Sequence, residues 1–522
     1  MKWKSSAPRI PPLLLGAIWI FPAVCLSLPE ARAQTAPPFI LPGYISVQPE
    51  AVPGRSPATS ITLRDRINTA IDESVPSEPA NHELKSLPTA EIIERAATGR
   101  VPESLRENSI MKPFIANVGP SGGPIAAYPG VALLLAQDKG DDHKKPFCSG
   151  TLVSPDMVLT AAHCVCRIWK TNDNKPDGYL TADLCKQGSS EKKLDPSPLL
   201  DPNRWAVFFQ HAGLFEVDQV ILDEGFVWPP SGDDIKADMA LLKLNHKIEW
   251  IAPARIAPAR TDNPFSQALA VGFGFNRNLS LTTSAAPLLP GLKGDGVMNV
   301  KTCQSGPAPG LICTEFDPTA ASSAGICHAD SGGPLWTSEL VGLASGSITD
   351  PCTDFASSAS EELQTRLSED TNSQWLGKQL GSASNHNTIW PWPAFAARDD
   401  LAEWPGPKVY YSLNGIPFDA FGRYRSSTVT VPSAGILIAT INSDVPLDSL
   451  EGFSVEEIST NKPACTGVVD RWETLYVNWC TVKTPANKSF RIVAKAQLGK
   501  PLGDALNLQV VLAVLPPGTP VP

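Results

Sequence analysis

Three residue types that together perform nucleophilic catalysis occur in order along the chain, each within a distinctive short segment. His163 lies in the run AAHC, Asp238 precedes the apolar run MALLKL, and Ser331 lies in the run DSGGP. A serine hydroxyl attacks a carbonyl carbon efficiently only when a base can take its proton. Histidine serves as that base when a buried carboxylate holds its tautomer and stabilises the imidazolium. These residues therefore indicate acyl transfer, provided that the fold brings them together.

The flanking sequence predicts the elements that would position these side chains. Residues 147–165, FCSGTLVSPDMVLTAAHCV, predict a strand, a turn at the Ser-Pro-Asp sequence and a second strand that ends near His163. Across residues 113–381, short apolar runs are separated by clusters of Gly, Pro, Asn and Asp, which is typical of a β-barrel or sandwich. Residues 361–381 predict a helix. The apolar residues expected on its buried side are Leu363, Leu367, Trp375, Leu376 and Leu380.

The three segments together resemble the motifs of the chymotrypsin/trypsin family of serine proteases. The order His, Asp, Ser is that of chymotrypsin and differs from the orders in subtilisins and α/β-hydrolases. The resemblance spans about residues 113–381 and implies an all-β fold of two six-stranded antiparallel barrels with a C-terminal helix. It places the active site between the barrels. It also selects Asp238 over the nearby Asp233 and Asp234, because MALLKL matches the family's aspartate strand.

The resemblance assigns roles to further residues. The catalytic residues would be His163, Asp238 and Ser331. The backbone N–H groups of Ala329 and Ser331 would form the oxyanion hole. The family usually has glycine where this chain has Ala329, whose backbone is more restricted. Asp330 would accept a new N-terminus after activation, and Ile115 is the candidate for that residue, although the family's usual activation sequence is not distinct here.

The resemblance also locates a specificity pocket. Its residues would be Gly325, Ser345, Gly346 and Glu362. In the family, an acid at the position of Gly325 selects Arg or Lys, so simple trypsin-like selectivity is not expected. If Glu362 points into the pocket, its desolvated carboxylate favours a basic substrate side chain. If it points outward, Gly325 and Ile326 leave an apolar pocket. Because isolated carboxylates are seldom buried, we expect a solvated Glu362 and an apolar preference.

The cysteine content indicates an oxidising compartment. Of 11 cysteines, Cys25 lies in an N-terminal apolar segment, and the remaining ten can pair completely. The spacings lack the paired two-residue knuckles of structural zinc sites, so we expect no metal and no other cofactor. The expected pairs are Cys148 with Cys164, Cys303 with Cys313 and Cys327 with Cys352 from the resemblance, Cys166 with Cys185 closing an insertion, and Cys465 with Cys480 as the two left over.

The N-terminus has the features of a cleavable signal peptide. Basic residues within the first nine positions precede an apolar run over residues 11–26, and Ala31-Arg32-Ala33 follows. Pro22 interrupts a run that is short for a bilayer span, so we expect cleavage after Ala33 rather than a membrane anchor. The protein would then be secreted, extracellular or periplasmic. Residues 1–33 carry four basic residues and one acidic residue, so cleavage changes the net charge from −10 to −13.

Three further parts accompany the region 113–381. Residues 34–112 are rich in Pro, Ser and charge and predict a pro-segment or linker. Residues 382–407 predict a Trp- and Pro-rich linker. From 408 to 522, runs such as GILIATI and LQVVLAVL predict a separate, small β-sandwich-like module.

Two functions fit these patterns. The first is an exported serine endopeptidase that hydrolyses proteins or peptides through an acyl-enzyme on Ser331. The second is a catalytically silent homologue that binds protein partners, which Ala329 and the indistinct activation sequence favour. The sequence has no basic stripe with interleaved aromatic residues, so nucleic acid is not an expected partner. It does not indicate an oligomeric state.

Overall fold

The computed structural model divides into two compact units, residues 1–43 and 44–522, and every described residue belongs to the second. The described residues are 128–138, 140–166, 180–190, 195–228, 235–251, 253–260, 265–274, 290–303, 310–316, 325–337, 339–347, 360–381, 408–414, 418–419, 421–432, 434–448, 452–467, 474–497 and 508–515. The expected signal peptide, pro-segment and linker lie outside them, as do Ile115 and Cys352.

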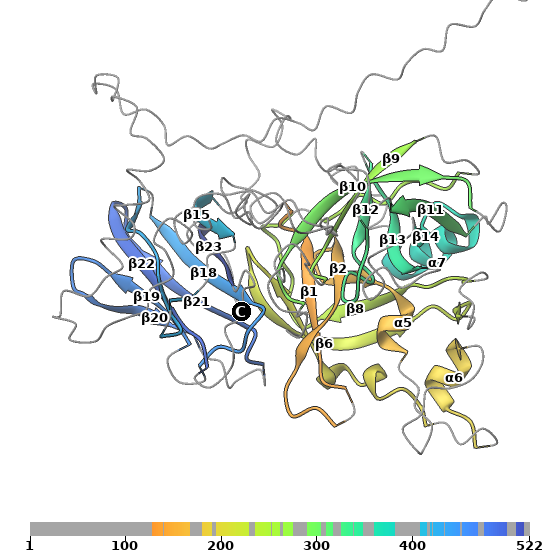
Figure 1. Cartoon of the computed structure of the whole chain (residues 1–522), viewed down its shortest axis with the longest axis horizontal. Helices are drawn as coiled ribbons and strands as arrows, with labels where there is room; N and C mark the ends of the chain where they lie inside the picture. The colour runs from red at the N-terminus through yellow and green to blue at the C-terminus, as the bar shows by residue number, and fades with distance from the viewer. Residues whose placement is uncertain are drawn as a thin grey trace, which may run out of the picture. The chain divides into compact units, whose positions relative to one another are not determined.

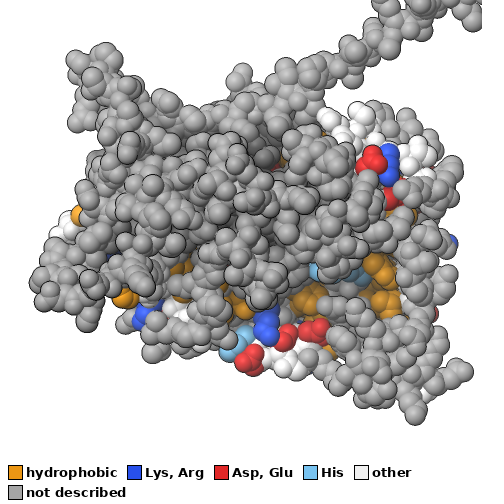
Figure 2. All heavy atoms as spheres, viewed as in Figure 1, with side chains coloured by type: hydrophobic (Ala, Val, Ile, Leu, Met, Phe, Trp, Pro, Cys, Tyr) orange, Lys and Arg blue, Asp and Glu red, His pale blue; other side chains and the backbone are white. Residues whose placement is uncertain are grey.

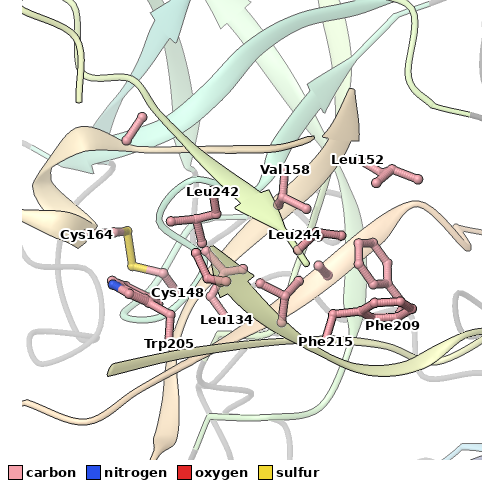
Figure 3. Close-up of a cluster of buried hydrophobic side chains, with 14 of the residues drawn as sticks. Leu134, Cys148, Leu152, Val158, Cys164, Trp205, Phe209, Phe215, Leu242 and Leu244 are labelled. Atoms are coloured by element: carbon pink, nitrogen blue, oxygen red, sulfur yellow. A yellow bond between two sulfur atoms is a disulfide. The ribbon is translucent and has the colours of Figure 1, made fainter. Parts of the chain in front are cut away.

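Six strands close the first barrel, drawn in orange to yellow in Figure 1. In barrel order they are β1 (Val131–Ala136), β2 (Lys145–Ser154), β3 (Met157–Thr160), β8 (Ala240–Leu244), β6 (Gly213–Leu222) and β5 (Trp205–Phe209). All neighbours are antiparallel. Figure 3 shows the barrel core, where Trp205 lies beside the Cys148–Cys164 disulfide and Phe209 lies edge-on to Phe215. Alternate residues of each strand supply this core, as the period of two requires.

A second closed barrel follows, drawn mainly in green in Figure 1. In barrel order its strands are β10 (Gly294–Lys301), β11 (Leu311–Phe316), β14 (Ser360–Arg366), β13 (Leu340–Ser347), β12 (Pro334–Trp336) and β9 (Gln267–Gly272). Every neighbouring pair is antiparallel. The expectation of two six-stranded antiparallel barrels is therefore confirmed.

The helix predicted over residues 361–381 is wrong in its first part. Residues 361–366 belong to strand β14, and the helix α7 covers only Asp370–Leu380. Strand β14 pairs with β11 and β13 and so closes the barrel, which overrides the helical tendency of its Glu- and Leu-containing sequence. The side chain of Glu369 caps α7 by accepting a hydrogen bond from Asn372 N, and Leu376 and Leu380 are buried.

Short elements connect the strands of the first barrel. They are α5 (Ala162–Val165), β4 (Leu180–Thr181), α6 (Ala182–Gln187), η1 (Pro198–Leu200), η2 (Pro202–Arg204) and β7 (Val227–Trp228). Strand β4 lies in the insertion and pairs with β7, and a disulfide between Cys166 and Cys185 ties α6 to the residue after α5. The insertion therefore supports the strand that carries Trp228.

The C-terminal module consists of two sheets. One contains, in order, β15 (Lys408–Asn414), β23 (Leu508–Leu515), β18 (Gly435–Ser443) and β21 (Val477–Thr484). The other contains β16 (Arg423–Arg425), β22 (Lys488–Lys495), β19 (Phe453–Glu457) and β20 (Lys462–Thr466), with β17 (Val429–Val431) also pairing with β22. Side chains from both sheets form one core, and a disulfide between Cys465 and Cys480 joins β20 to β21. This arrangement is a β-sandwich.

Strands β18 and β23 use both of their faces for apolar packing. On β18, Leu437, Ala439 and Ile441 enter the sandwich core, whereas Ile436 and Ile438 belong to the core cluster of the first barrel. Strand β23 alternates in the same way. Burial of both faces explains why these two runs are continuously hydrophobic in the sequence.

A buried amide cluster also joins the module to both barrels. Gln210, in the turn between β5 and β6, donates from Nε2 to Asn442 Oδ1 at 2.8 Å and to Gln509 Oε1 at 2.9 Å. Asn442 donates to Gly291 O at 2.6 Å. Gln509 accepts from Lys293 N at 2.7 Å and donates to Lys293 O at 2.8 Å, beside the start of β10. The module therefore contacts the first barrel and the segment entering the second barrel through polar groups without contact to solvent.

Charged side chains of both signs lie next to one another on the molecular face shown in Figure 2. Ion pairs within the described residues include Arg491 with Glu456 at 2.6 Å and Arg255 with Glu339 at 2.9 Å. No helix within the described residues is long and apolar enough to cross a membrane. In the same residues, no group of three or more His, Cys, Asp or Glu side chains is arranged to hold a metal ion.

Candidate active site

The structure brings His163 and Asp238 together between two strands of the first barrel. His163 lies in α5, directly after β3, and Asp238 lies directly before β8, which pairs with β3. Asp238 Oδ1 accepts a hydrogen bond from His163 N, and Oδ2 lies 2.8 Å from His163 Nδ1. Because an ionised carboxylate only accepts, the proton of the neutral imidazole lies on Nδ1. The other ring nitrogen, Nε2, is then free to accept a proton.

Two residues of the second barrel hold Asp238 in place. Ser345 Oγ donates to Asp238 Oδ2 at 2.5 Å, and Thr365 Oγ1 donates to Asp238 O at 3.4 Å. Asp238 has no exposed surface, whereas 19% of the His163 side chain is exposed. Ser345, which the resemblance placed in the specificity pocket, thus contacts the carboxylate that orients His163. The contact joins the two barrels at the site.

Ser331 lies on a tight turn that packs against the strands leading to His163. Its carbonyl accepts from Ser149 N on β2 at 2.9 Å, and Gly332 N donates to Ala344 O at 2.7 Å. Gly332 has a φ of +77°, and a Cβ there would collide with Thr160 and Ala161, just before His163. Only glycine fits this close approach. Among the described residues no hydrogen bond joins Ser331 to His163, and such contacts in substrate-free sites commonly tighten on binding.

Ala329 has the backbone conformation that glycine usually supplies. Its φ is +72°, in the left-handed region, which costs a non-glycine residue about 1 to 2 kcal/mol. Its carbonyl accepts from Ser149 Oγ at 2.8 Å, and the next amide, Asp330 N, donates to Cys327 O at 3.0 Å. The side chain at this position therefore does not prevent the turn from forming.

Asp330 is buried beneath this turn. Its Oδ1 accepts from Gly274 N at 2.7 Å and its Oδ2 accepts from Cys327 N at 3.0 Å. Burial raises the pKa of Asp330 to about 7, although both hydrogen bonds favour the ionised form. A Cβ at Gly272 or Gly274 would collide with this carboxyl group. The two glycines therefore make room for Asp330.

The residues expected to form a specificity pocket lie close together, but the expected solvation of Glu362 is wrong. Gly325 and Ile326 are buried, and Glu362 has no exposed surface. Glu362 Oε1 accepts from Ile326 N at 2.8 Å, while Oε2 has no hydrogen bond within the described residues. Burial raises the pKa of Glu362 well above its ordinary value, and the nearby carboxylate of Asp330 raises it further. The strand pairing of β14 turns this side chain inward.

Four of the five expected disulfides occur among the described residues. They join Cys148 to Cys164, Cys166 to Cys185, Cys303 to Cys313, and Cys465 to Cys480. Cys327 is disulfide-bonded, and its expected partner, Cys352, lies outside the described residues.

Comparison with known proteins gives a family match over much of the two barrels. Residues 148–343 match the family model of the trypsin-like peptidase domain. This region is a chymotrypsin/trypsin-like domain. Its relatives support a serine protease function at the level of the family.

Two similar curated proteins are serine proteases by name. CLIP domain-containing serine protease B9 of Anopheles gambiae is 27% identical over 237 residues, covering 44% of this chain and 55% of that protein. Tryptase of Mus musculus is 29% identical over 209 residues, covering 37% of this chain and 65% of that protein. The chain thus spans less than two thirds of either relative. Among solved structures, mouse neuropsin is 18% identical, with a TM-score of 0.32, and the match covers 49% of this chain and 96% of that chain.

Trp228 contributes to the site of this trypsin-like domain although the motifs did not indicate it. Its ring centroid lies 4.5 Å from that of His163, at an interplanar angle of 49°. A Cβ added at Gly346 would lie 3.2 Å from Trp228 Cη2. The indole thus lies against both His163 and the end of β13, in space left open by the missing side chain of Gly346. Its only sequence signal is an aromatic residue just before the loop that leads to Asp238.

Proposed function

We propose that this chain is an exported serine endopeptidase that cleaves peptide bonds through an acyl-enzyme on Ser331. The observation that carries the proposal is the pair of contacts between Asp238 and His163, with the Ser331 turn packed against the segment before His163. Because Asp238 engages Nδ1, His163 Nε2 is left to act as the base. The four disulfides and the signal-like N-terminus support export.

The proposed reaction begins with proton transfer from Ser331 Oγ to His163 Nε2 as Oγ attacks the substrate carbonyl carbon. The carbonyl oxygen becomes an oxyanion, which the N–H groups of Ala329 and Ser331 stabilise. His163 then gives its proton to the leaving amine, and the C–N bond breaks. Water repeats the sequence on the acyl-enzyme, releases the acid product and restores Ser331. Asp238 stabilises the imidazolium in both halves of the reaction.

We further propose that the substrate residue entering the pocket is basic. The carboxyl group of Glu362 is fully buried, and one oxygen lacks a hydrogen bond. An Arg or Lys side chain would supply donors and a compensating charge, which would favour the ionised carboxylate. The alternative of an apolar substrate residue depended on a solvated Glu362, and burial of this side chain removes that support.

Reaction with a biotinylated fluorophosphonate tests the catalytic proposal against the alternative of a silent, partner-binding homologue. We expect the mature protein to be labelled and peptide mapping to locate the label on Ser331. Ser331→Ala and His163→Ala should prevent labelling, whereas heat-denatured protein gives the background. A folded, N-terminally processed protein that is not labelled would support the silent homologue. N-terminal sequencing of the exported protein tests export and should find no residue before Gln34.

A further inference from the structure

Ser149 is a buried serine that uses all of its polar groups to hold the turn around Ser331. It lies on β2, next to Cys148, and has no exposed surface. Its N–H donates to Ser331 O at 2.9 Å, its Oγ donates to Ala329 O at 2.8 Å, and its carbonyl accepts from Thr160 Oγ1 at 2.8 Å. Neither the family motif nor the proposed mechanism gives this side chain a role.

The direction of the Ser149 hydroxyl proton follows from its partners. Phe273 N donates to Ser149 Oγ at 2.9 Å, so one lone pair of the oxygen is already used. The carbonyl of Ala329 can only accept, so the single hydroxyl proton must point to it. The hydroxyl therefore links three segments: strand β2, the residue after β9, and the turn that carries Ala329.

This link bears directly on the conformation of Ala329. Its φ of +72° is unfavourable for alanine, which prefers negative φ. Rotation of φ to a negative value, with the carbonyl held, would turn the Ala329 N–H away from its present direction. If the hydroxyl were removed, the carbonyl of Ala329 and the N–H of Phe273 would both lose a buried partner. The left-handed conformation of Ala329 would then lose a hydrogen bond that stabilises it.

We propose that Ser149 is a positioning residue, which compensates for alanine at the oxyanion turn by holding Ala329 in the left-handed conformation. The proposal rests on the proposed protease function, in which the Ala329 N–H binds the oxyanion. It predicts that Ser149 acts on the transition state more than on substrate binding, because the oxyanion forms only during reaction.

The test compares Ser149→Ala with the double variant Ser149→Ala/Ala329→Gly, using Ala329→Gly as the reference for the double variant. We expect Ser149→Ala to lower kcat about 10- to 100-fold, somewhat less than complete loss of one oxyanion donor, with KM changed less than about 2-fold. The inhibition constant of a peptidyl aldehyde should rise in parallel with the loss in kcat/KM. Glycine adopts positive φ without strain, so a glycine at position 329 should not need the Ser149 hydroxyl. We therefore expect the kcat of the double variant to be close to that of Ala329→Gly, which recovers most of the loss seen in Ser149→Ala.

Ser154→Ala is the matched control. Ser154 is the last residue of β2, and within the described part of the chain its hydroxyl bonds only to Asp156, at 2.9 Å. It should keep wild-type kcat. A merely structural role of Ser149 would lower the unfolding midpoint without separating kcat from KM, and Ala329→Gly would not rescue kcat. Either of these results, or unchanged kcat in Ser149→Ala, would overturn the proposal.

Crystal structures of the wild type and Ser149→Ala provide a readout that does not need activity. We expect a positive φ at Ala329 in the wild type and a negative φ in the variant. A positive φ in both proteins contradicts the proposed action of Ser149, even if the fluorophosphonate labels Ser331. If the wild type is not labelled but φ changes sign as expected, the protease function fails and the positioning role stands.

Discussion

Both carboxylate oxygens of Asp238 form hydrogen bonds, and each holds a different part of His163. Oδ1 holds the backbone through His163 N, while Oδ2 holds the ring through Nδ1 and also accepts from Ser345 Oγ. An amide at this position could donate to Nδ1 and would stabilise the tautomer that carries its proton on Nε2. That tautomer cannot take the proton of Ser331.

We therefore expect Asp238→Asn to lower kcat by about 10⁴-fold near neutral pH with little change in the unfolding midpoint. The measurement is the initial rate of peptide hydrolysis over a range of pH. Ser345→Ala serves as the comparison, because it removes one of the bonds to Asp238 but keeps the carboxylate, and its loss in kcat should be much smaller. Equal losses in the two variants would contradict the tautomer argument.

Glu362 gives a second prediction at the scale of one residue. We expect Glu362→Gln to remove most of the preference for Arg and Lys, because it keeps the shape of the side chain and removes its charge. In the wild type, the preference for basic residues should increase as pH rises, since the pKa of Glu362 is raised and only the ionised carboxylate attracts a cation. Cleavage of a mixed peptide library at several pH values measures both effects. A basic preference that survives in Glu362→Gln would exclude this role.

Among the secondary-structure elements, the β4–β7 pair determines where Trp228 lies. The Cys166–Cys185 disulfide closes a loop with a sequence separation of 19 residues and fixes α6, which directly follows β4. Strand β7 is only two residues long, so its pairing with β4 and one bridge between Val227 and Lys236 are what hold it. The insertion thus supports Trp228 in its place beside His163.

We expect Trp228→Ala to raise KM for peptide substrates about 10-fold, roughly 1.4 kcal/mol, with a smaller change in kcat. The indole supplies apolar surface at the site, whereas the tautomer of His163 is set by Asp238 at Nδ1. Steady-state kinetics with substrates that differ only in the residues preceding the cleaved bond measure the effect. The variant Cys166→Ser/Cys185→Ser should shift KM in the same direction. A fall in kcat alone would show that Trp228 acts on His163 instead.

For the molecule as a whole, the C-terminal module is part of the same packed structure as the barrels. Gln509 exchanges two hydrogen bonds with the backbone of Lys293 and accepts from Gln210 and Asn442, all without contact to solvent. A leucine in its place would leave the N–H and C=O of Lys293 without these partners and would remove one acceptor each from Gln210 and Asn442. Each such group costs about 1 to 3 kcal/mol.

We therefore expect Gln509→Leu to lower the free energy of unfolding by about 3 kcal/mol or more. Denaturant unfolding measures the change, with Gln267→Ala as the control. Gln267 also donates from its amide to an asparagine, at 3.1 Å, but this pair is exposed, so its loss should cost under about 0.5 kcal/mol. Equal effects of the two variants would mean that the module does not depend on the buried cluster.

His211 links the stability of the whole molecule to pH. Its ring is fully buried beside this cluster, and neither ring nitrogen has a partner among the described residues. Burial, with a smaller contribution from the charge of Lys293, lowers the pKa of His211 to about 3. Between pH 6.5 and 3 the unfolded chain therefore binds a proton that the folded chain does not, and this residue destabilises the fold as pH falls.

The free energy of unfolding should depend on pH differently in the wild type and in His211→Leu. We expect the unfolding free energy of the wild type, relative to the variant, to decrease by up to about 1.4 kcal/mol for each pH unit below 6.5. Denaturant titrations at pH 7, 6, 5 and 4 measure this difference. The comparison isolates His211 from the buried Asp295 and Asp330, whose raised pKa values act in the opposite direction and are present in both proteins. A difference that does not vary with pH would show that His211 is not the group responsible.

The sequence by itself predicted an all-β region from its local pattern, and the resemblance to the chymotrypsin/trypsin family specified two barrels. It also singled out His163, Asp238 and Ser331, because each lies in a segment whose local pattern is distinctive. Strand periodicity and turn residues are local properties. The four disulfides found were expected on other grounds: two from the family resemblance, Cys166–Cys185 from the insertion that it closes, and Cys465–Cys480 as the two cysteines left over. Local helix propensity predicted the wrong structure for residues 361–366. Closure of the second barrel makes them a strand, and this strand turns Glu362 into the interior.

Only the tertiary structure decided the contacts that refine the site and join the C-terminal module to it. Ser149 meets Ala329 across 180 positions, and Gln210 meets Gln509 across 299. Trp228 contacts His163 because β7 pairs with β4, and no sequence motif predicted this pairing. Hydrogen bonds and ring contacts require placement to within a few tenths of an ångström, and that placement depends on how distant segments pack rather than on the sequence near either partner.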